Sequence, residues 1–225
     1  EEGGWPAPSY GVVRAIIADL ARRDYRVTIP TRNRQRHRNL LVFPGVDLVP
    51  ADIHDEQALA RLVAGSDAVI NLVGILNERG HDGSGFRRAH VELTRKVLKA
   101  CIETGVDRLL HMSALKANAD RGPSHYLRTK GQAEQLIRAE SGDAVRYTIF
   151  KPSVIFGPGD SFINRFAGLL KIMPVLPLAC AEARMSPAYV EDVAAAFVTA
   201  LEDGRTHGRT YELCGPEIFS LGEIV

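Results

Sequence analysis

Tyr126 and Lys130 are the residues whose types and spacing are best suited to chemistry. Four residues apart on a helix, their side chains would leave the same face. A free phenol titrates at about pH 10, and a neighbouring ammonium lowers that pKa toward the range useful for general acid–base work. Ser113 follows an apolar run, and its hydroxyl is suited to hold a carbonyl or alcohol oxygen while the phenol moves the proton. The alternative interpretation is a surface helix that carries Tyr126 and Lys130 by chance.

Strand and helix patterns alternate along the chain and must position these residues. Apolar periodicity predicts strands at 25–29, 46–49, 67–73, 108–112, 145–150 and 210–214, and helices at 12–22, 55–63, 86–104, 126–140, 162–172 and 190–202. This alternation predicts an α/β fold with a mostly parallel sheet covered by helices on both faces. Ligands of such sheets bind beyond the carboxyl ends of the strands. Arg32, Asp52, Gly74, Ser113 and Ser153 all fall at or just past predicted strand ends, which predicts a single ligand crevice.

The composition limits the function classes. At 225 residues, with 45% apolar and 24% charged residues, the chain is long enough for one good core and a small second lobe. A net charge of +1 gives no electrostatic reason to expect nucleic acid or an anionic membrane as a partner. Cys101, Cys180 and Cys214 lack metal-ligand spacing, so we expect no metal site. Neither a signal peptide nor a membrane-spanning run is evident, which favours the cytoplasm or, after processing, an organelle matrix.

Six segments, in this order, resemble one protein family. They are VTIPTRN (27–33), PADIHD (50–55), AVINLVGI (68–75), RLLHMSAL (108–115), YLRTK (126–130) and FKPSVIFGPGD (150–160). The series resembles the extended and atypical short-chain dehydrogenase/reductases, often labelled NAD-dependent epimerase/dehydratase. The likeness is greatest to the branch that contains the NAD(P)H-binding accessory subunit of respiratory complex I and its bacterial relatives. It implies a Rossmann-type, doubly wound parallel sheet over residues 1–225, with 156–225 contributing a smaller substrate-side lobe.

The resemblance also implies where the adenosine half of a dinucleotide would lie. Arg32 matches the position that meets the adenosine ribose or its 2′-phosphate, which favours NADP(H) over NAD(H). Asp52 and Ile53 match the pair that faces the adenine. The alternatives are a solvated charge for Arg32 and an ordinary strand-end turn for the pair.

The nicotinamide half is implied in the same way. Tyr126 and Lys130 match the catalytic pair, with Lys130 also contacting the nicotinamide ribose, and Ser113 lies near the family's catalytic serine. Asn71, Val73 and Gly74 match the family's strand end that runs beside the cofactor. Pro152 and Ser153 match the segment near the nicotinamide amide. A structural turn is the alternative at Gly74. Ser124 is a poorer substitute for Ser113, and His90 and His111 lie in apolar patterns expected of core or supporting residues.

The beginning of the chain departs from the family pattern. The family opens with an apolar strand that leads into Gly-x-x-Gly-x-x-Gly, whose backbone amides hold the pyrophosphate. Here the last two glycine positions fall near Tyr10 and Val13, and residues 1–9 supply no apolar strand. Three explanations are open. The beginning of the sequence is altered by a sequence or frame error, the first strand is missing, or the protein has lost tight cofactor binding. All three predict a weakened sheet and poor dinucleotide affinity for the chain as it stands.

Three functions remain open after these considerations. The first is an NADP(H)-dependent oxidoreductase or epimerase that works through Tyr126 and Lys130. The second is a non-catalytic nucleotide-binding subunit of a respiratory complex I-type assembly, and the third is a degenerate scaffold. The substrate-side residues form an apolar stripe that is either core or the lining for an apolar or quinone-like ligand: Phe162, Phe166, Leu169, Met173, Leu176 and Leu178. A capping box at 220–223 predicts a helix that starts just before the chain stops, so we expect a cut C-terminus.

Overall fold

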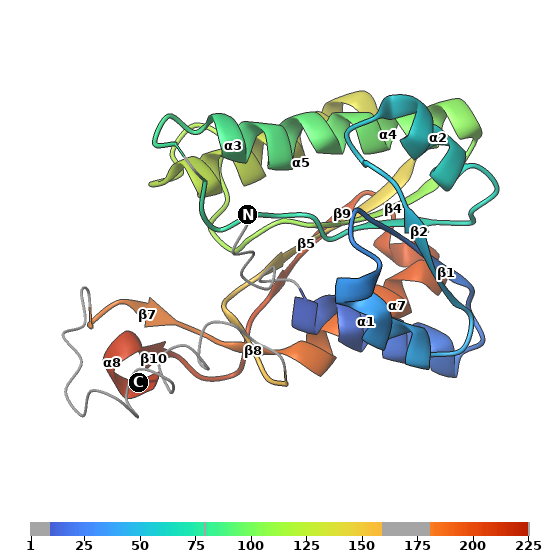
Figure 1. The fold of residues 1–225 in the computed structure, drawn as a ribbon. Helices are drawn as coiled ribbons and strands as arrows, with labels where there is room; N and C mark the ends of the chain where they lie inside the picture. Colours follow the sequence, from blue (N-terminus) through green and yellow to red (C-terminus); the bar gives the residue numbers. More distant parts are fainter. Residues whose placement is uncertain (1–9, 79, 159–180, 225) are drawn as a thin grey trace.

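The computed structural model describes residues 10–78, 80–158 and 181–224. Its central sheet has four parallel strands in the order β3-β4-β5-β9 (Figure 1). Their bounds are Val69–Asn71, Arg108–Met112, Arg146–Pro152 and Arg209–Leu213. A separate parallel pair consists of β1 (Val27–Thr31) and β2 (Val46–Pro50). The predicted parallel α/β fold is therefore confirmed, but the sheet is divided into two pieces.

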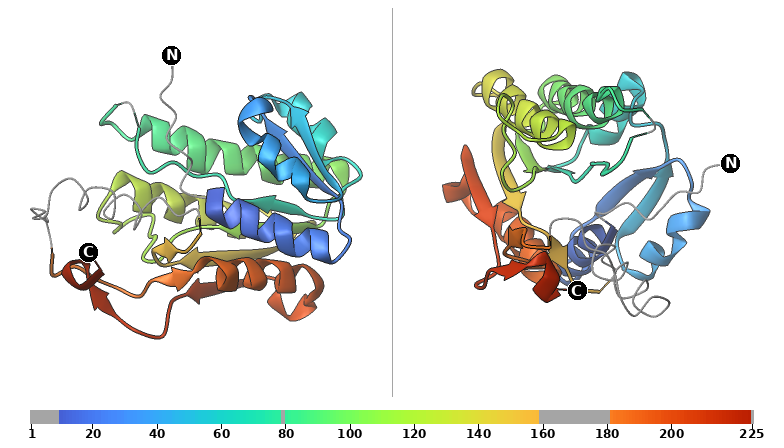
Figure 2. Two further views of the ribbon diagram at one scale, coloured as in Figure 1. Left: turned by 60° about the horizontal axis from the view of Figure 1, so that its bottom comes forward. Right: turned by 90° about the vertical axis from the view of Figure 1, so that its left-hand side faces the viewer.

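Helices cover both faces of the four-stranded sheet (Figures 1 and 2). On one face lie α2 (Glu56–Val63), α4 (Leu93–Thr104) and α5 (His125–Glu140), and on the other lie α1 (Tyr10–Arg22) and α7 (Val190–Glu202). Each layer buries its own apolar cluster, one centred on residues such as Leu98 and Ile137 and the other on Ile16 and Phe197. Strands that are covered on both faces are buried along their length, as in β4, all five residues of which are buried, Arg108 and His111 included.

Helix α1 connects the two pieces of the sheet. Its residues Val12 and Ile16 pack in the cluster under the four-stranded sheet, whereas Ile17 packs with Leu48 of β2 and Leu40. Leu40 belongs to the short helix η1 (Gln35–Val42), which overlaps a basic run of four arginines, Arg32, Arg34, Arg36 and Arg38. The β1–β2 pair is thus held to the rest of the molecule partly by a side-chain contact through α1.

The residue types at three element ends explain where those elements begin or stop, and the predicted capping box at 220–223 is confirmed. The Asp55 carboxylate accepts hydrogen bonds from the backbone N–H groups of Gln57 and Ala58 and caps α2. Gly105 ends α4 in the left-handed conformation, with φ of 76°. The capping box forms as Glu223 accepts from the Ser220 N–H, and α8 (Leu221–Ile224) follows.

Two predicted elements differ in detail. The helix expected at 86–104 consists of α3 (Ser84–Phe86), a π-helical segment η2 (Arg87–Glu92) and α4, and His90 lies in the π-helical part. The strand expected at 67–73 is only three residues long in β3, which pairs with β4 and with no other described strand.

The C-terminal part contains short paired strands (Figure 2). They form two pairs, β6 (Ile155–Phe156) with β8 (Ala188–Tyr189), and β7 (Arg184–Met185) with β10 (Phe219–Ser220). Within the three described ranges, no helix is sufficiently long and apolar to cross a bilayer. Among the same residues, no group of three or more His, Cys, Asp or Glu side chains is arranged to hold a metal ion.

Candidate functional site

Helix α5, which covers one face of the sheet (Figure 1), carries Tyr126 and Lys130 one turn apart, and Lys130 reaches the carboxyl ends of β3 and β4. The helix begins there because the Ser124 hydroxyl accepts a hydrogen bond from the Leu127 N–H at 3.2 Å. Ser124 is therefore occupied as a helix cap. The sequence analysis ranked Ser124 below Ser113 as a candidate for the catalytic serine. The capping role of Ser124 agrees with that ranking.

Lys130 is buried among strand ends, with 2% of its surface exposed. Its Nζ donates to the carbonyl oxygens of Val73 at 3.2 Å and Met112 at 3.0 Å, which follow β3 and end β4. Burial lowers the pKa of Lys130 to about 8, although the Glu134 carboxylate opposes the shift. A buried ammonium held by two carbonyls thus places a donor where β3 and β4 end.

We expect this burial to make stability depend on pH. Because the folded pKa of Lys130 lies below the unfolded value of about 10.4, the unfolded chain binds more protons between these values. The free energy of unfolding attributable to Lys130 should therefore rise by about 1–2 kcal/mol between pH 7.5 and 9.5. Urea unfolding of wild type and Lys130→Met at these pH values measures the difference.

The comparison with Lys130→Met also removes a contribution of Cys101 to the pH dependence of the free energy of unfolding, which opposes that of Lys130. Burial raises the pKa of the Cys101 thiol to about 11, so its contribution to stability falls above the unfolded pKa. Both proteins share that effect, and it cancels in the difference. If the stabilities of the two proteins changed in parallel with pH, Lys130 would be fully protonated in the folded state.

Gly74 makes room for Lys130. A Cβ at position 74 would lie 3.0 Å from Lys130 Nζ and 3.4 Å from its Cε. Asn71 stabilises the same strand end, since its Oδ1 accepts from the Val73 N–H at 3.1 Å and its Nδ2 donates to Thr94 Oγ1 at 3.3 Å. The resemblance placed Gly74 beside a cofactor, and in this structure the atom nearest to its Cβ position is Lys130 Nζ. Asn71, Val73 and Lys130 form one hydrogen-bonded unit, with Gly74 in contact with Lys130.

Tyr126 lies beside this unit in an apolar setting. The half-buried ring packs edge-on against His90, with centroids 5.4 Å apart, and against Phe86 at 6.1 Å. Burial raises the pKa of Tyr126 to about 12. The expectation that Lys130 lowers this pKa is wrong for this structure, because burial dominates and Lys130 Nζ is directed to backbone carbonyls.

His90 and His111 are buried beside the site and contact the residues that form it. His90 Nε2 accepts from the Ile75 N–H at 3.1 Å, which leaves Nδ1 to donate to Thr129 Oγ1 at 2.8 Å. Burial and the Lys130 charge lower the pKa of His90 to about 3, so the ring is neutral. His111 is also buried, and its Nδ1 lies 3.3 Å from Asn71 Nδ2. Both histidines have the core and supporting positions expected from their apolar surroundings.

Ser113 is engaged by a carboxylate that the sequence did not single out. Its Oγ donates to Glu134 Oε1 at 2.5 Å, and both residues are buried. Glu134 also accepts from Arg138 at 3.0 Å and lies 3.5 Å from Lys151 Nζ. Glu134 is four residues after Lys130, a spacing that would have revealed it on the same face of α5. In this structure the Ser113 hydroxyl is directed to α5.

Pro152 and Ser153 continue the carboxyl edge of the sheet at the end of β5. The Pro152 carbonyl accepts from the Leu115 N–H at 2.8 Å, and the Ser153 N–H donates to the Leu213 carbonyl at 2.9 Å. These bonds hold the chain after β5 between the segment that carries Ser113 and strand β9.

Arg32, Asp52 and Ile53 lie on the β1–β2 side. Asp52 accepts from the His54 N–H at 2.9 Å, and this bond, with the nearby charges of Arg32 and Arg88, lowers the pKa of Asp52. Ile53 instead packs against the core cluster that contains α2 and α4. Arg88 is a second cation near Asp52 that the sequence reasoning missed, and only the folding of η2 toward β2 reveals it.

The two positions that the resemblance assigns to pyrophosphate-binding glycines, Tyr10 and Val13, carry packed side chains. The Tyr10 hydroxyl accepts from Asn39 Nδ2 at 2.5 Å, and the Tyr10 ring lies 5.9 Å from that of His37. Val13 packs beside Ile17 in the cluster under β1 and β2. The first turn of α1 therefore presents large side chains where backbone amides would have to approach phosphate. Gly3 and Gly4, the other glycines considered, lie outside the described residues.

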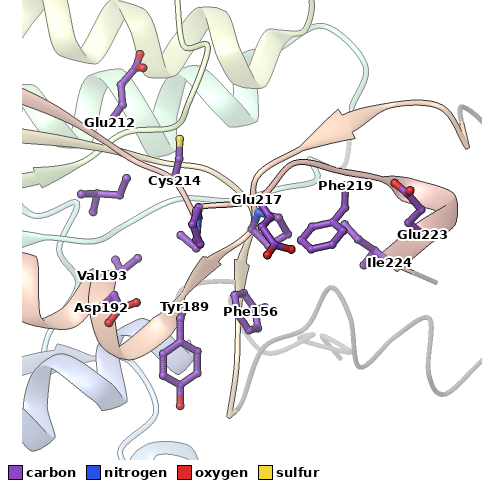
Figure 3. Close-up of a pocket in the computed structure, with 15 residues that line it drawn as sticks. Phe156, Tyr189, Asp192, Val193, Glu212, Cys214, Glu217, Phe219, Glu223 and Ile224 are labelled. Carbon is purple, nitrogen blue, oxygen red and sulfur yellow. The ribbon is translucent and has the colours of Figure 1, made fainter.

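A separate pocket of about 620 Å³ lies in the C-terminal part (Figure 3). Apolar side chains such as Phe156, Tyr189 and Phe219 line it, and Asp192 and Glu217 are among the carboxylates around it. The apolar stripe that the sequence analysis considered as a ligand lining, from Phe162 to Leu178, lies outside the described residues.

Comparisons with known proteins identify the family and the fold. Residues 12–214 match the profile of the NAD dependent epimerase/dehydratase family. The chain is 33% identical over 219 residues to NADH dehydrogenase (ubiquinone) 1 alpha subcomplex subunit 9, mitochondrial, of Arabidopsis thaliana, covering 94% of this chain and 53% of that protein. It is 29% identical over 188 residues to a ceramide reductase of Caulobacter vibrioides, covering 82% of this chain and 56% of the relative.

Solved structures support the fold. MoeE5 in complex with UDP-glucose and NAD has a TM-score of 0.81 with 20% identity, over 95% of this chain and 76% of MoeE5. At that identity the likeness shows the fold alone. The chain spans little more than half the length of the two sequence relatives described above.

Proposed function

Because the chain belongs to the NAD dependent epimerase/dehydratase family, we propose that it carries the catalytic side of a nicotinamide dinucleotide site. In this proposal Tyr126 exchanges a proton with the substrate in an oxidoreductase or epimerase reaction, and Lys130 orients the ribose. The dinucleotide, when bound, supplies or accepts the hydride. The observation that carries the proposal is Lys130, buried over Gly74 and one turn from Tyr126 at the strand ends.

The remaining assigned residues have supporting roles in this proposal. Asn71 and Val73 hold the strand end beside Lys130, Pro152 and Ser153 border the nicotinamide side, and Ser113 holds the reacting oxygen once its hydroxyl turns from Glu134. Asp52 and Ile53 lie on the adenine side. The 156–225 segment contributes the substrate-side lobe.

The affinity of this chain for dinucleotide is expected to be weak. Loss of two charge-assisted hydrogen bonds to phosphate costs about 3 kcal/mol or more, which is at least a hundredfold in Kd. We therefore expect a Kd weaker than about 100 μM for both NADPH and NADH, measured by nicotinamide fluorescence and by melting temperature. Saturable binding at micromolar NADPH would show that Tyr10 and Val13 leave the crevice usable and would contradict this expectation.

The preferred cofactor is NADP(H), because two cations surround the predicted ribose position. Arg32 and Arg88 both lie near Asp52, and a 2′-phosphate would give them a dianion to bind. We expect Arg32→Gln to weaken NADPH binding about tenfold and to leave NADH binding unchanged. Arg34→Gln is the matched control, since Arg34 is another exposed arginine of the same basic run. Equal losses for both nucleotides would assign Arg32 a merely general electrostatic role.

A second function, a non-catalytic nucleotide-binding subunit, is favoured by a specific observation. The pKa of Tyr126 is about 12 and Lys130 is bonded to carbonyls, so the pair is not activated in this state. The Arabidopsis relative is by its name a subunit of NADH dehydrogenase, which supports a partner in a respiratory complex. Retained NADPH binding without hydride exchange against a broad carbonyl and sugar-nucleotide panel would favour this function.

The substrate of the enzymatic alternative is proposed to be apolar or quinone-like. The name of the Caulobacter relative, ceramide reductase, supports a lipid-like carbonyl compound. We place the protein in the cytoplasm or an organelle matrix, associated with a membrane through a partner complex. Reduction of long-chain ketones in preference to sugar nucleotides by the purified chain would support the apolar substrate.

A further inference from the structure

Helix η1 exposes two large apolar side chains next to arginines. The exposed fraction is 75% for Val42 and 40% for Leu41. Arg34 immediately precedes the helix, Arg38 lies within it, and both are exposed. The helix lies on the outside of the molecule, between β1 and β2 in the chain (Figure 2). We call these four residues, together with the neighbouring Arg14 of α1, the η1 patch.

The helix type explains why these side chains face outward. A 3-10 helix has three residues per turn, so every third side chain lies on the same face. The inner face of η1 consists of His37, Leu40 and the following Phe43, which are buried or half-buried. Leu40 and Phe43 pack in the cluster that contains Ile17. All other residues from 35 to 42 are exposed, so the core takes up only one third of the helix surface.

The outer surface of η1 has a basic end and an apolar end. A 3-10 helix rises about 2 Å per residue, so Leu41 lies one turn, or about 6 Å, beyond Arg38. The Arg14 guanidinium lies over the Phe43 ring, 5.8 Å from its centroid, and brings a third cation to the apolar end. Residues 25–46 contain five arginines and no acidic residue. The patch is therefore positive, although the net charge of the whole chain is only +1.

These features together specify the chemistry of the partner. Guanidinium groups bind phosphate through paired N–H donors. Leu41 and Val42, one turn away, need a partner that offers hydrocarbon close to those phosphates. A nucleic acid or a soluble phosphate supplies the anion and leaves Val42 in water. An anionic phospholipid surface supplies both, because its acyl chains begin just below the phosphates, and long arginine side chains reach the phosphates while apolar neighbours lie deeper.

We propose that the η1 patch is a membrane-contact site. Arg14, Arg34 and Arg38 bind the phosphates of an anionic bilayer surface, while Leu41 and Val42 enter the boundary of the acyl chains. The contact is direct and needs no partner subunit. It is independent of the proposed function, because none of these five residues has a role in catalysis or in nucleotide binding there, and it can be tested without nucleotide.

Cosedimentation of the chain with sucrose-loaded vesicles tests the proposal directly. One set of vesicles contains roughly one-third phosphatidylglycerol in phosphatidylcholine, and the other contains phosphatidylcholine alone. At about 0.1 M salt we expect binding to the anionic vesicles to be at least about tenfold stronger. Raising the salt to about 1 M should weaken it about tenfold, because the arginine–phosphate attraction is screened. Equal binding to both sets, or no binding to the anionic set, would overturn the proposal.

Arginine variants test the phosphate contacts. Arg34→Gln and Arg38→Gln should each weaken binding to the anionic vesicles about fivefold, the usual contribution of one arginine near such a surface. Arg209→Gln is the matched control, because Arg209 is exposed on β9, at the other edge of the four-stranded sheet. It should bind as wild type does, and an equal loss in all three variants would contradict a local site. Arg34→Gln should also keep its affinity for NADPH, which separates this test from that of the proposed function.

A double variant tests the apolar contact. Leu41→Ser with Val42→Ser should weaken binding to the anionic vesicles about tenfold, because two side chains no longer leave water. The matched control is Ile102→Ser with Ile218→Ser, which removes two other exposed apolar side chains. We expect both double variants to keep the wild-type melting temperature, and the arginine variants test the proposal even if one does not. Binding of polyglutamate as tight as that of the vesicles, with no loss in the Leu41 and Val42 variant, would assign the patch to an acidic polypeptide and overturn the proposal.

Discussion

Replacing Tyr126 by phenylalanine is expected to reduce turnover about 10²–10⁴-fold, the usual contribution of a positioned general acid or base. Burial raises the pKa of Tyr126 to about 12, so the phenol is protonated at neutral pH, and in the reductive direction of the proposed reaction it would be the proton donor. The nucleotide Kd should stay within about twofold, because removing one hydroxyl leaves Lys130 and the strand ends in place. Steady-state rates with a long-chain ketone and NADPH, together with nucleotide titration, measure both quantities.

Tyr147→Phe is the matched control for Tyr126→Phe. Tyr147 lies in β5, where its ring packs against the core cluster of α2, α4 and α5. We expect Tyr147→Phe to keep wild-type turnover. If Tyr126→Phe also kept it, the proton would have to come from another group. If wild type reduces nothing in the panel while it binds nucleotide, the non-catalytic subunit is the better assignment.

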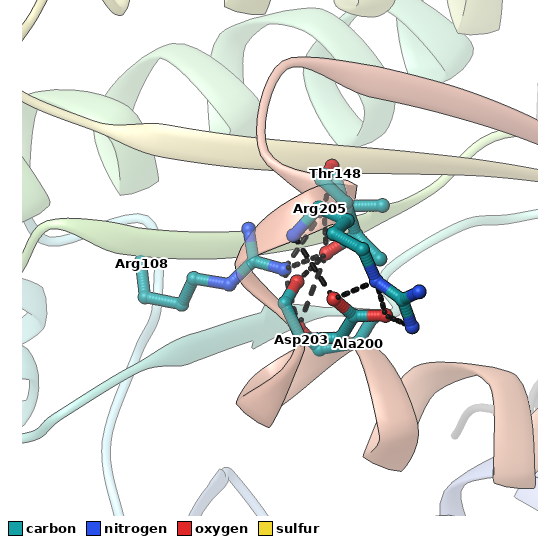
Figure 4. Close-up of polar contacts among 6 residues, drawn as sticks. Arg108, Thr148, Ala200, Asp203 and Arg205 are labelled. Atoms are coloured by element: carbon teal, nitrogen blue, oxygen red, sulfur yellow. Dashed lines mark hydrogen bonds and ion pairs between the residues drawn. The ribbon is translucent and has the colours of Figure 1, made fainter.

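Replacing Arg108 by methionine is expected to lower the free energy of unfolding by about 3 kcal/mol. The buried guanidinium donates to the Arg146 and Ala200 carbonyls at 2.8 and 2.6 Å and to the Thr148 and Thr206 hydroxyls at 2.8 and 2.9 Å (Figure 4). Ala200 lies in the last turn of α7, where carbonyls lack a partner within the helix. Arg108 thus joins β4, β5, α7 and the following turn, and methionine can donate to none of them.

The loss should appear as a melting temperature lower by about 6–12 °C in a chain of this size. Arg205→Met is the matched control, since the exposed Arg205 is paired with Asp203 two residues away (Figure 4). We expect Arg205→Met to melt with wild type, because exposed ion pairs contribute little. An Arg108→Met protein as stable as wild type would mean that the cost of burying the Arg108 charge cancels its four hydrogen bonds.

Patterns that depend on neighbouring residues were predictable from the sequence. Apolar periodicity located the longer helices and strands of the described residues, and Asp55, Gly105 and the Ser220–Glu223 box placed element ends within a residue or two. These signals are local, because a cap or an amphipathic face involves residues at most a few positions apart. The strand-end positions of Arg32, Gly74 and Ser113 followed from the same alternation.

The orientation and electrostatics of the site required the tertiary structure. Ser113 donates to Glu134 from 21 positions away, and Lys130 Nζ reaches the carbonyl of Val73 from 57 positions away. The pKa of Tyr126 rises where the sequence predicted a fall, because desolvation depends on packing by Phe86 and His90, which no local pattern reports.

The sequence by itself determined the family and the parallel α/β fold, and it placed Tyr10 and Val13 where the family has glycines, since each depends on residue identity and order. Only the tertiary structure decided where the sheet of the described residues divides, between the β1–β2 pair and β3. The physical reason is that strand pairing depends on which chain segments lie side by side in the folded protein. Whether the Thr28 peptide group makes a hydrogen bond to a neighbouring strand therefore depends on residues far from it in the sequence.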